Sequence, residues 1–241
     1  MSGANRYATL MTSLPYHPSL FAAKQTPLSR IRLRQRLQLM LTPEDAQQLS
    51  LAANILEWPK QPADDSDTDI VKRAQGLVRQ LDRPLLQDIA RERLEMRTLV
   101  AAMRRRHSGA AAPGEREAWG YGRWVNHIRR NWGDPVFRLE RVFRWGQEAN
   151  RLLQQGDALG LERLLLSTAW TDLDRHALGH YFDFAAVVIY SLRWSLSARW
   201  TGYDAEAAAL SFDTLITDAL PAQTEQLFQC GPGVTLGDRS A

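Results

Sequence analysis

The chain has 241 residues, of which 44% are hydrophobic and 24% charged, and its net charge at pH 7 is +3. This composition is ordinary for a globular protein and excludes a chain that stays disordered for lack of apolar residues. A single cysteine, Cys230, excludes a disulfide framework and a cysteine-based zinc site within one chain, and it is typical of a reducing cytoplasm.

The N-terminal residues lack the basic start and long apolar run of a signal peptide. Residues 7–14 are apolar and end at Pro15, which predicts either a short extended segment or one helical turn. Over residues 27–41, arginines alternate with apolar residues at the period of a strand. Ser29, however, suits an N-cap, and arginine and leucine favour helices, so we expect a helix there.

The next part of the chain predicts three further helices. One begins at Thr42 and Pro43, where a capping hydroxyl precedes a proline and acidic residues, and it runs to about residue 58. A polar linker over residues 60–68 leads to a helix over about 67–81. The third starts at Pro84 and runs to about His107, with one apolar face.

After a loop at residues 108–114, helix signals return. Asp134 and Pro135 predict the start of a helix that reaches about residue 155. Asp157 caps another, which ends near Trp170. Residues 182–200 are the most apolar stretch, but they include two arginines, so they predict a buried helix rather than a membrane span. Asp204 caps a last helix over about 205–219.

These elements predict an all-α fold, a multi-helix bundle of about eight to nine helices with a short extended N-terminal segment. The loop at 108–114 is a candidate boundary between two helical lobes, residues 1–108 and 115–220, with a mobile tail at 221–241. A single domain is the alternative.

The sequence contains no complete catalytic, metal-binding or phosphate-binding motif. The acidic run 64–69 would place Ile70 and Gly76 where a calcium loop needs glycine and a bidentate glutamate. His176 and His180 have helical ligand spacing but lack the adjacent glutamate of zinc hydrolases, and the alternative is a polar loop. Neither a phosphate-binding loop nor a nucleophile elbow is present. We therefore expect no enzyme activity, no metal and no cofactor.

Residues 119–137, WGYGRWVNHIRRNWGDPVF, are the most unusual stretch. Residues 119–145 contain six arginines and two acidic residues among several aromatic residues. On a helix, Trp124, Ile128 and Trp132 would form one packing stripe. Core packing is the leading interpretation, a protein-docking surface is the second, and binding of single-stranded nucleic acid is the third.

Five segments also resemble a known family when they are read together. In order, they are RYATLMTSLPY, TPEDAQQL, RERLEMRTLVAAMRRRH, WGYGRWVNHIRRNWGDPVF and DFAAVVIYSLRWSLSARWTGYDAEAAALSF. They resemble a bacterial family encoded among the genes of V/A-type ATP synthases, which is similar to a shortened form of the helical coupling subunit of V-type ATPases. The resemblance covers residues 6 to about 215.

The resemblance implies an all-helical, funnel-like protein that receives the central stalk and sits on the membrane rotor ring. Such a protein would be cytoplasmic, peripheral to the membrane, and bound only to other subunits. The full-length coupling subunit has three similar lobes, whereas this chain can supply two. We place the docking surface at Arg123, Arg129 and Arg130, with Trp124 and Trp132 bracing them. The alternative is a module that binds nucleic acid or an anionic ligand through residues 119–145.

Overall fold

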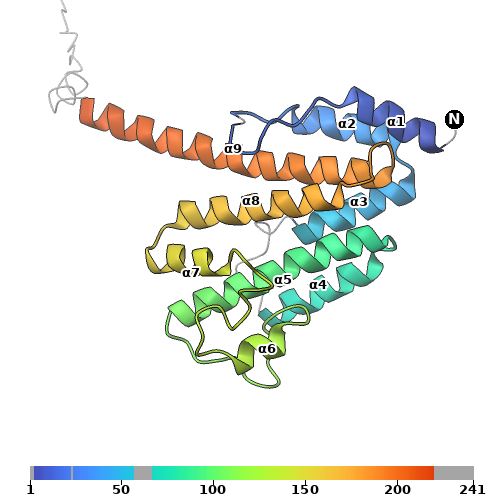
Figure 1. The fold of residues 1–241 in the computed structure, drawn as a ribbon. Coiled ribbons are helices and arrows are strands. Elements are labelled where there is room, and N and C mark those ends of the chain that lie inside the picture. The colour runs from blue at the N-terminus through green and yellow to red at the C-terminus, as the bar shows by residue number, and fades with distance from the viewer. Residues whose placement is uncertain (1–2, 23, 57–66, 220–241) are drawn as a thin grey trace, which may run out of the picture. The chain divides into compact units, whose positions relative to one another are not determined.

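The computed structural model describes residues 3–22, 24–56 and 67–219, in which every regular element is an α-helix (Figure 1). The all-α prediction is therefore confirmed, and the number of described helices agrees with it. The nine described helices are α1 (Gly3–Ser13), α2 (Arg30–Met40), α3 (Pro43–Leu56), α4 (Asp67–Gln80), α5 (Pro84–His107), α6 (Val125–Arg130), α7 (Gly146–Gln154), α8 (Ala158–His176) and α9 (Phe184–Ala219).

The chain divides into two compact units, Met1–Trp200 and Thr201–Ala241. The first unit contains α1 to α8 and the first half of α9, and the predicted boundary at residues 108–114 lies inside it. Of the second unit, the structure describes residues 201–219, which continue α9. The predicted tail at 221–241 and Cys230 lie outside the described residues, as do residues 64–66 of the acidic run.

Local capping signals set the start of several helices, as predicted. The Ser29 hydroxyl accepts a hydrogen bond from the Arg32 amide at 3.4 Å, and α2 follows. The Thr42 hydroxyl accepts from the Asp45 amide at 3.1 Å ahead of α3. Asp157 Oδ1 accepts from the Gly160 amide at 2.7 Å at the start of α8. Each bond satisfies a backbone donor that the helix itself leaves unpaired.

The prediction of an extended N-terminal segment is wrong, because these residues form α1. Helix α1 has an apolar face whose Leu10 is fully buried against Val187, Tyr190 and Trp194 of α9. Helical geometry lets residues one turn apart face the same side, and Leu14 joins Leu10 in this cluster. Burial of that face against α9 favours helix over strand.

The helix predicted from Asp134 to residue 155 is also wrong in its first half. Asp134 Oδ1 accepts from the amides of Val136 at 2.9 Å and Arg138 at 3.0 Å, and the Arg138 amide holds the pKa of Asp134 below its usual value. Phe137 and Arg138 both have φ of 57°, a left-handed conformation that a helix cannot contain. The chain turns here, and α7 begins only at Gly146.

Two predicted helix ends are wrong as well. Helix α8 continues past Trp170 to His176, and α9 passes through Asp204 without a break. Gly202 is the weakest helix former near that point, and one glycine costs about 1 kcal/mol in a helix. Without a proline, that cost does not end a helix, so no new helix begins at residue 204.

Helix α5 is the centre of the first unit, where it contacts α3, α4, α6, α7 and α8. Its predicted apolar face is confirmed, since Leu86, Ile89, Met96, Val100 and Met103 are all buried. The N-terminal half of α5 belongs to a core shared with α3, α4, α8 and α9. Its C-terminal half belongs to a second core with residues 119–152. Helix α5 therefore supports both the stretch 119–137 and the helices opposite it.

Candidate functional site

Residues 119–123 pass very close to α5. The Tyr121 amide donates to Thr98 Oγ1 at 2.8 Å, and the Arg123 amide donates to Glu95 Oε1 at 3.3 Å. A Cβ atom on Gly120 would lie 2.6 Å from Thr98 Cγ2, and Gly122 has φ of +100°. Both glycines are therefore needed to let the backbone approach α5 and turn away from it.

Replacing Thr98 by valine should lower the free energy of unfolding by about 1–3 kcal/mol, because it leaves the partly buried Tyr121 amide without its acceptor. Valine has the same shape, so packing changes little. Urea denaturation would measure the loss. The matched control is Thr171→Val, since that exposed hydroxyl only adds a second donor to the Ser167 carbonyl inside α8. Equal stability of the two variants would contradict the Thr98 contact.

The tryptophans of the stretch pack inside the second core. Trp119 is buried and lies edge-on to Trp132, with ring centroids 6.5 Å apart. Trp132 stacks at a tilt 5.4 Å from Phe137 and donates from Nε1 to the Ala110 carbonyl at 3.1 Å. Trp124 lies edge-on to Phe143 at 6.4 Å. These aromatic faces contact other side chains of the protein rather than an open surface.

The arginines of the stretch differ from one another in exposure. The Arg123 side chain is 74% exposed, lies over the Trp124 ring at 5.1 Å, and is 3.6 Å from Glu95. Arg129 is mostly buried, and Glu115 is 3.9 Å from it. Arg130 is exposed and forms no ion pair with any described residue. Of the predicted docking residues, Arg123 and Arg130 therefore face solvent, while Trp124 and Trp132 are part of the packing.

Arg106, in the last turn of α5, binds the backbone of the 119–137 stretch. Its guanidinium donates from Nε to the Trp132 carbonyl at 3.0 Å and from Nη2 to the Gly133 carbonyl at 3.3 Å. Neighbouring Arg105 pairs with Glu117 at 2.6 Å. Arg105 and Arg106 thus connect the end of α5 to residues 117–133, and they also place cations at a helix C-terminus.

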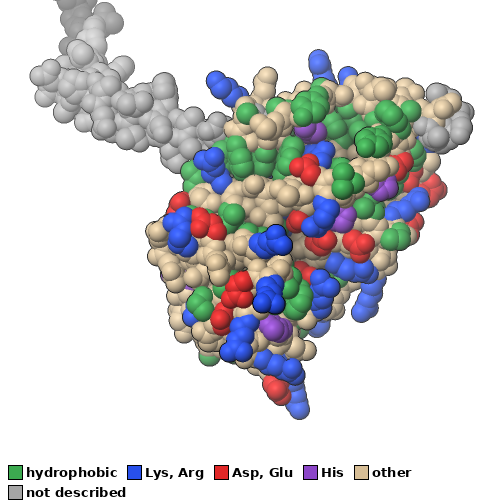
Figure 2. Space-filling model, in the orientation of Figure 1, with side chains coloured by type: hydrophobic (Ala, Val, Ile, Leu, Met, Phe, Trp, Pro, Cys, Tyr) green, Lys and Arg blue, Asp and Glu red, His purple; other side chains and the backbone are tan. Residues whose placement is uncertain are grey.

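The charged surface has no single basic face in the view of Figure 2, where Lys and Arg side chains are spread over the molecule with Asp and Glu among them. Within the described ranges, no helix combines the length and the apolar character that crossing a membrane requires.

The two histidines tested as metal ligands are held apart by different partners. His176 ends α8 and lies 2.9 Å from Glu92 Oε2, whereas His180 lies in the following loop and contacts Asp183 Oδ2 at 2.5 Å. They do not share a helix face, because α8 ends between them. Among the described residues, no group of three or more His, Cys, Asp or Glu side chains is placed to hold a metal ion.

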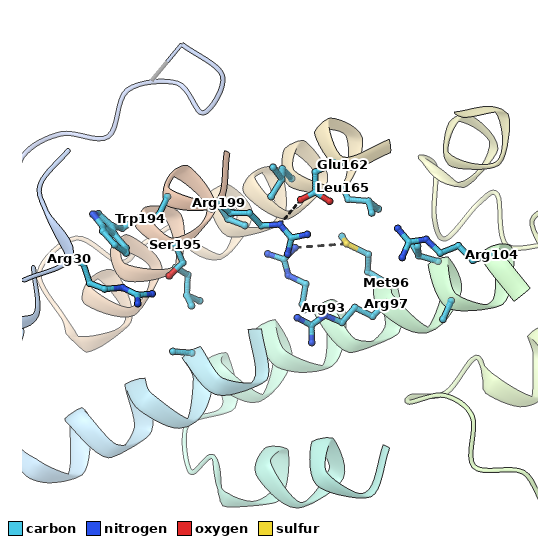
Figure 3. Close-up of a pocket in the computed structure, with 17 residues that line it drawn as sticks. Arg30, Arg93, Met96, Arg97, Arg104, Glu162, Leu165, Trp194, Ser195 and Arg199 are labelled. Carbon is cyan, nitrogen blue, oxygen red and sulfur yellow. Dashed lines mark hydrogen bonds and ion pairs between the residues drawn. The ribbon is translucent and has the colours of Figure 1, made fainter. Parts of the chain in front are cut away.

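A cavity of about 430 Å³ lies in the first unit between α3, α5, α8 and α9 (Figure 3). Apolar side chains from these helices form most of its wall. Five arginines and one carboxylate, that of Glu162, are the charged residues among its described lining. In Figure 3, Arg30 and Trp194 lie at one end of the view and Arg104 at the other. The remaining arginines, Arg93, Arg97 and Arg199, lie between these ends.

The three arginines in the middle of this cavity have different interaction partners. Arg199 pairs with Glu162. Arg97 donates from Nη1 to the Ile55 carbonyl at 2.8 Å. Arg93 forms no ion pair with any described residue, and its Nη1 lies 4.0 Å from Met96 Sδ, a weak acceptor. Burial lowers the pKa of Arg93 to about 10. The pKa of Arg97 is lowered to about 9, mainly by burial and secondly by the nearby charge of Arg93.

Sequence reasoning missed this cavity, although part of the signal was present. Arg93, Arg97 and Arg104 are four and eleven positions apart, which places them on one face of a helix with 3.6 residues per turn. They share that face with Met96 and Val100, so cations recur along an apolar stripe. Arg30 and Arg199 come from distant helices, and no local pattern connects them with α5.

The loop between α8 and α9 exposes three large apolar side chains close together in sequence. The exposed fractions of Leu178, Tyr181 and Phe182 are 75%, 69% and 55%. Clustered exposed apolar residues are typical of contact sites for other proteins.

Comparison with known proteins identifies no relative of this chain. No protein-family model matches the chain, and searches of curated proteins and of solved structures return no match.

Proposed function

We propose that the protein is a non-enzymatic coupling component of a V/A-type ATPase, which links the soluble motor to the membrane rotor ring by protein–protein contact. It would lie at the cytoplasmic face of the membrane and bind the central-stalk and rotor-ring subunits, without a cofactor. The observation that carries this proposal is the order of the five segments that resemble the family encoded beside those ATPases. The resemblance implies a funnel shape, which stays a prediction.

The geometry supports a role in binding and transmitting force. One long helix, α5, contacts five other helices, and the 119–137 stretch is tied to it by hydrogen bonds through Thr98 and Glu95. Because interiors packed in this way resist deformation, such a unit can pass on a torque. Exposed arginines and exposed apolar side chains are available for contact, and both kinds of residue are common at protein interfaces.

Nucleic-acid binding through residues 119–145 is the second candidate, and the geometry favours it less. Binding of single strands needs aromatic faces on which bases can stack. Trp119 instead lies edge-on to Trp132, and Trp132 packs at a tilt on Phe137, as part of the second core. The exposed arginines alone could meet phosphates, and that contact would weaken steeply with salt.

The direct test is affinity purification of the tagged full chain from gently solubilised host membranes, with and without nuclease. We expect catalytic and central-stalk ATPase components to be recovered in both samples, as identified by mass spectrometry. Recovery of the chain alone, or of nucleic acid that nuclease removes, would show that the proposed function is wrong.

The contact surface can be tested with a charge reversal. Arg130→Glu should lower recovery of the stalk components about tenfold or more, because it places a like charge where the partner presents an acidic group. Arg130 suits this test since it is exposed and its change disturbs no ion pair among described residues. The matched control is Arg34→Glu, on the exposed side of α2. Unchanged recovery with Arg130→Glu would exclude this surface as the docking site.

A further inference from the structure

We propose that the cavity between α3, α5, α8 and α9 binds a small organic anion, whose apolar body fills the cavity and whose carboxylate or phosphate group pairs with Arg93 (Figure 3). This inference does not depend on the proposed function, because it concerns a ligand of the isolated chain.

The charges of the cavity favour an anion. Five guanidinium groups line it, and the one carboxylate among the described lining residues, Glu162, already pairs with Arg199. A cation in a crowded site is costly unless an opposite charge meets it, so a ligand anion would be attracted strongly.

Arg93 is the residue best placed to receive the anionic group. It lies on the cavity-facing side of α5, and a thioether is its one acceptor among the described residues. A guanidinium has five N–H donors in a planar fork that matches a carboxylate or a phosphate. The side chain keeps intermediate exposure, so a ligand can reach it. Burial lowers the pKa of Arg93, and the charges of Asp172 and Glu162 offset this shift only in part.

The apolar walls of the cavity favour a ligand whose remaining part is apolar. Met96, Val100, Leu165, Leu192 and Leu196 present apolar surface, and they come from three different helices. A volume of about 430 Å³ lies within the range of small-molecule sites, which are mostly apolar with a few polar groups that fix orientation. A bare inorganic ion would leave this apolar surface in contact with water. An amphiphilic anion would cover it.

Calorimetric titration of the purified full chain with four probes tests both parts of the proposal. The probes are octyl phosphate, octanoate, 1-octanol and inorganic phosphate. We expect saturable binding of octyl phosphate or octanoate, at least about tenfold tighter than octanol or inorganic phosphate, which corresponds to one charge-assisted hydrogen bond. The tighter of the two anions identifies the head group. Absence of saturable binding by both anions, or equal binding of octanol, overturns the proposal.

Variants locate the site. Arg93→Met should weaken binding of the anionic probes about tenfold or more, without lowering the melting temperature of the ligand-free protein, because methionine replaces a poorly paired cation with apolar volume. Arg91→Met is the matched control, since Arg91 is exposed, pairs with Asp88 and does not line this cavity. Ala101→Trp, at an exposed position of the lining, should block entry and weaken both anions. Wild-type affinity in Arg93→Met and Ala101→Trp would show that the anions bind elsewhere.

Discussion

The free energy of unfolding should fall by about 2–3 kcal/mol between pH 7 and pH 4 through His17 alone. His17 is only 7% exposed, and burial lowers its pKa from 6.5 to about 4. The ring lies between Trp170, at a centroid distance of 5.9 Å, and Tyr190, at 4.2 Å. Arg193 adds a repulsive charge, which also opposes protonation.

The sign of this pH dependence follows from how many protons the folded and unfolded chains bind. Between pH 6.5 and pH 4, the unfolded chain protonates this histidine and the folded chain does not, so stability falls as the pH falls. The hydrogen bond agrees with a neutral ring, since Nε2 donates to the Tyr190 carbonyl at 3.1 Å while buried Nδ1 has no partner among the described residues. Protonation would add a second buried donor without an acceptor.

Urea denaturation of the wild type and of His17→Gln at several pH values would measure this effect. Glutamine does not titrate and can still donate to the Tyr190 carbonyl. We expect the wild type to lose about 2–3 kcal/mol more than the variant between pH 7 and pH 4. His107→Gln is the control, because His107 is exposed at the end of α5. Parallel stability curves for the wild type and His17→Gln would contradict the buried neutral histidine.

Phe137→Ala should lower the free energy of unfolding by about 3–5 kcal/mol, the usual loss for a large aromatic residue in a core. Phe137 is fully buried and stacks on Trp132. Its carbonyl accepts a hydrogen bond from His127 Nε2 at 3.0 Å, so the turn around it is also tied to α6. The left-handed backbone conformation costs alanine as much as phenylalanine, so the loss should reflect packing alone.

Denaturant unfolding followed by tryptophan fluorescence would measure this loss, because Trp132 reports on the same core. Val142→Ala is the matched control in the same segment, where 44% of the side chain is exposed and we expect a change within about 0.5 kcal/mol. A loss below about 1 kcal/mol for Phe137→Ala would mean that the cavity left behind collapses, and that residues 134–139 are not rigidly packed.

His17 lies in the N-terminal segment and Phe137 in the tryptophan-rich stretch, and both side chains are buried in the fold. Within residues 119–137, Arg123 and Arg130 are exposed while Trp119 and Phe137 are buried, so the stretch combines a packing role with the exposed charges that a docking role would need. Its glycines let it lie on α5 at Thr98 and Glu95. A charge change at Arg130 can therefore test docking, whereas a change at Trp132 would mainly test stability.

Local sequence patterns were enough to predict the helical class and the start of several helices. Pro43, Pro84 and Asp157 begin helices because capping and proline at the first turn act within four residues, so the signal is local. The apolar face of α5 was equally predictable, since its period follows from helical geometry alone. The resemblance to an ATPase component, by contrast, implies a function that these local signals do not contain.

Other features depend on contacts between distant residues, which local patterns do not contain. Asp134 and Pro135 look like a helix start, but burial of Phe137 against Trp132 favours a left-handed turn there. The N-terminal residues form a helix, α1, because this conformation buries Leu10 against α9. The arginine-lined cavity exists because α2 and α9 bring Arg30 and Arg199 to the arginines of α5. Packing between distant segments outweighs local preferences of about 1 kcal/mol, and such packing has no signature in a short stretch of sequence.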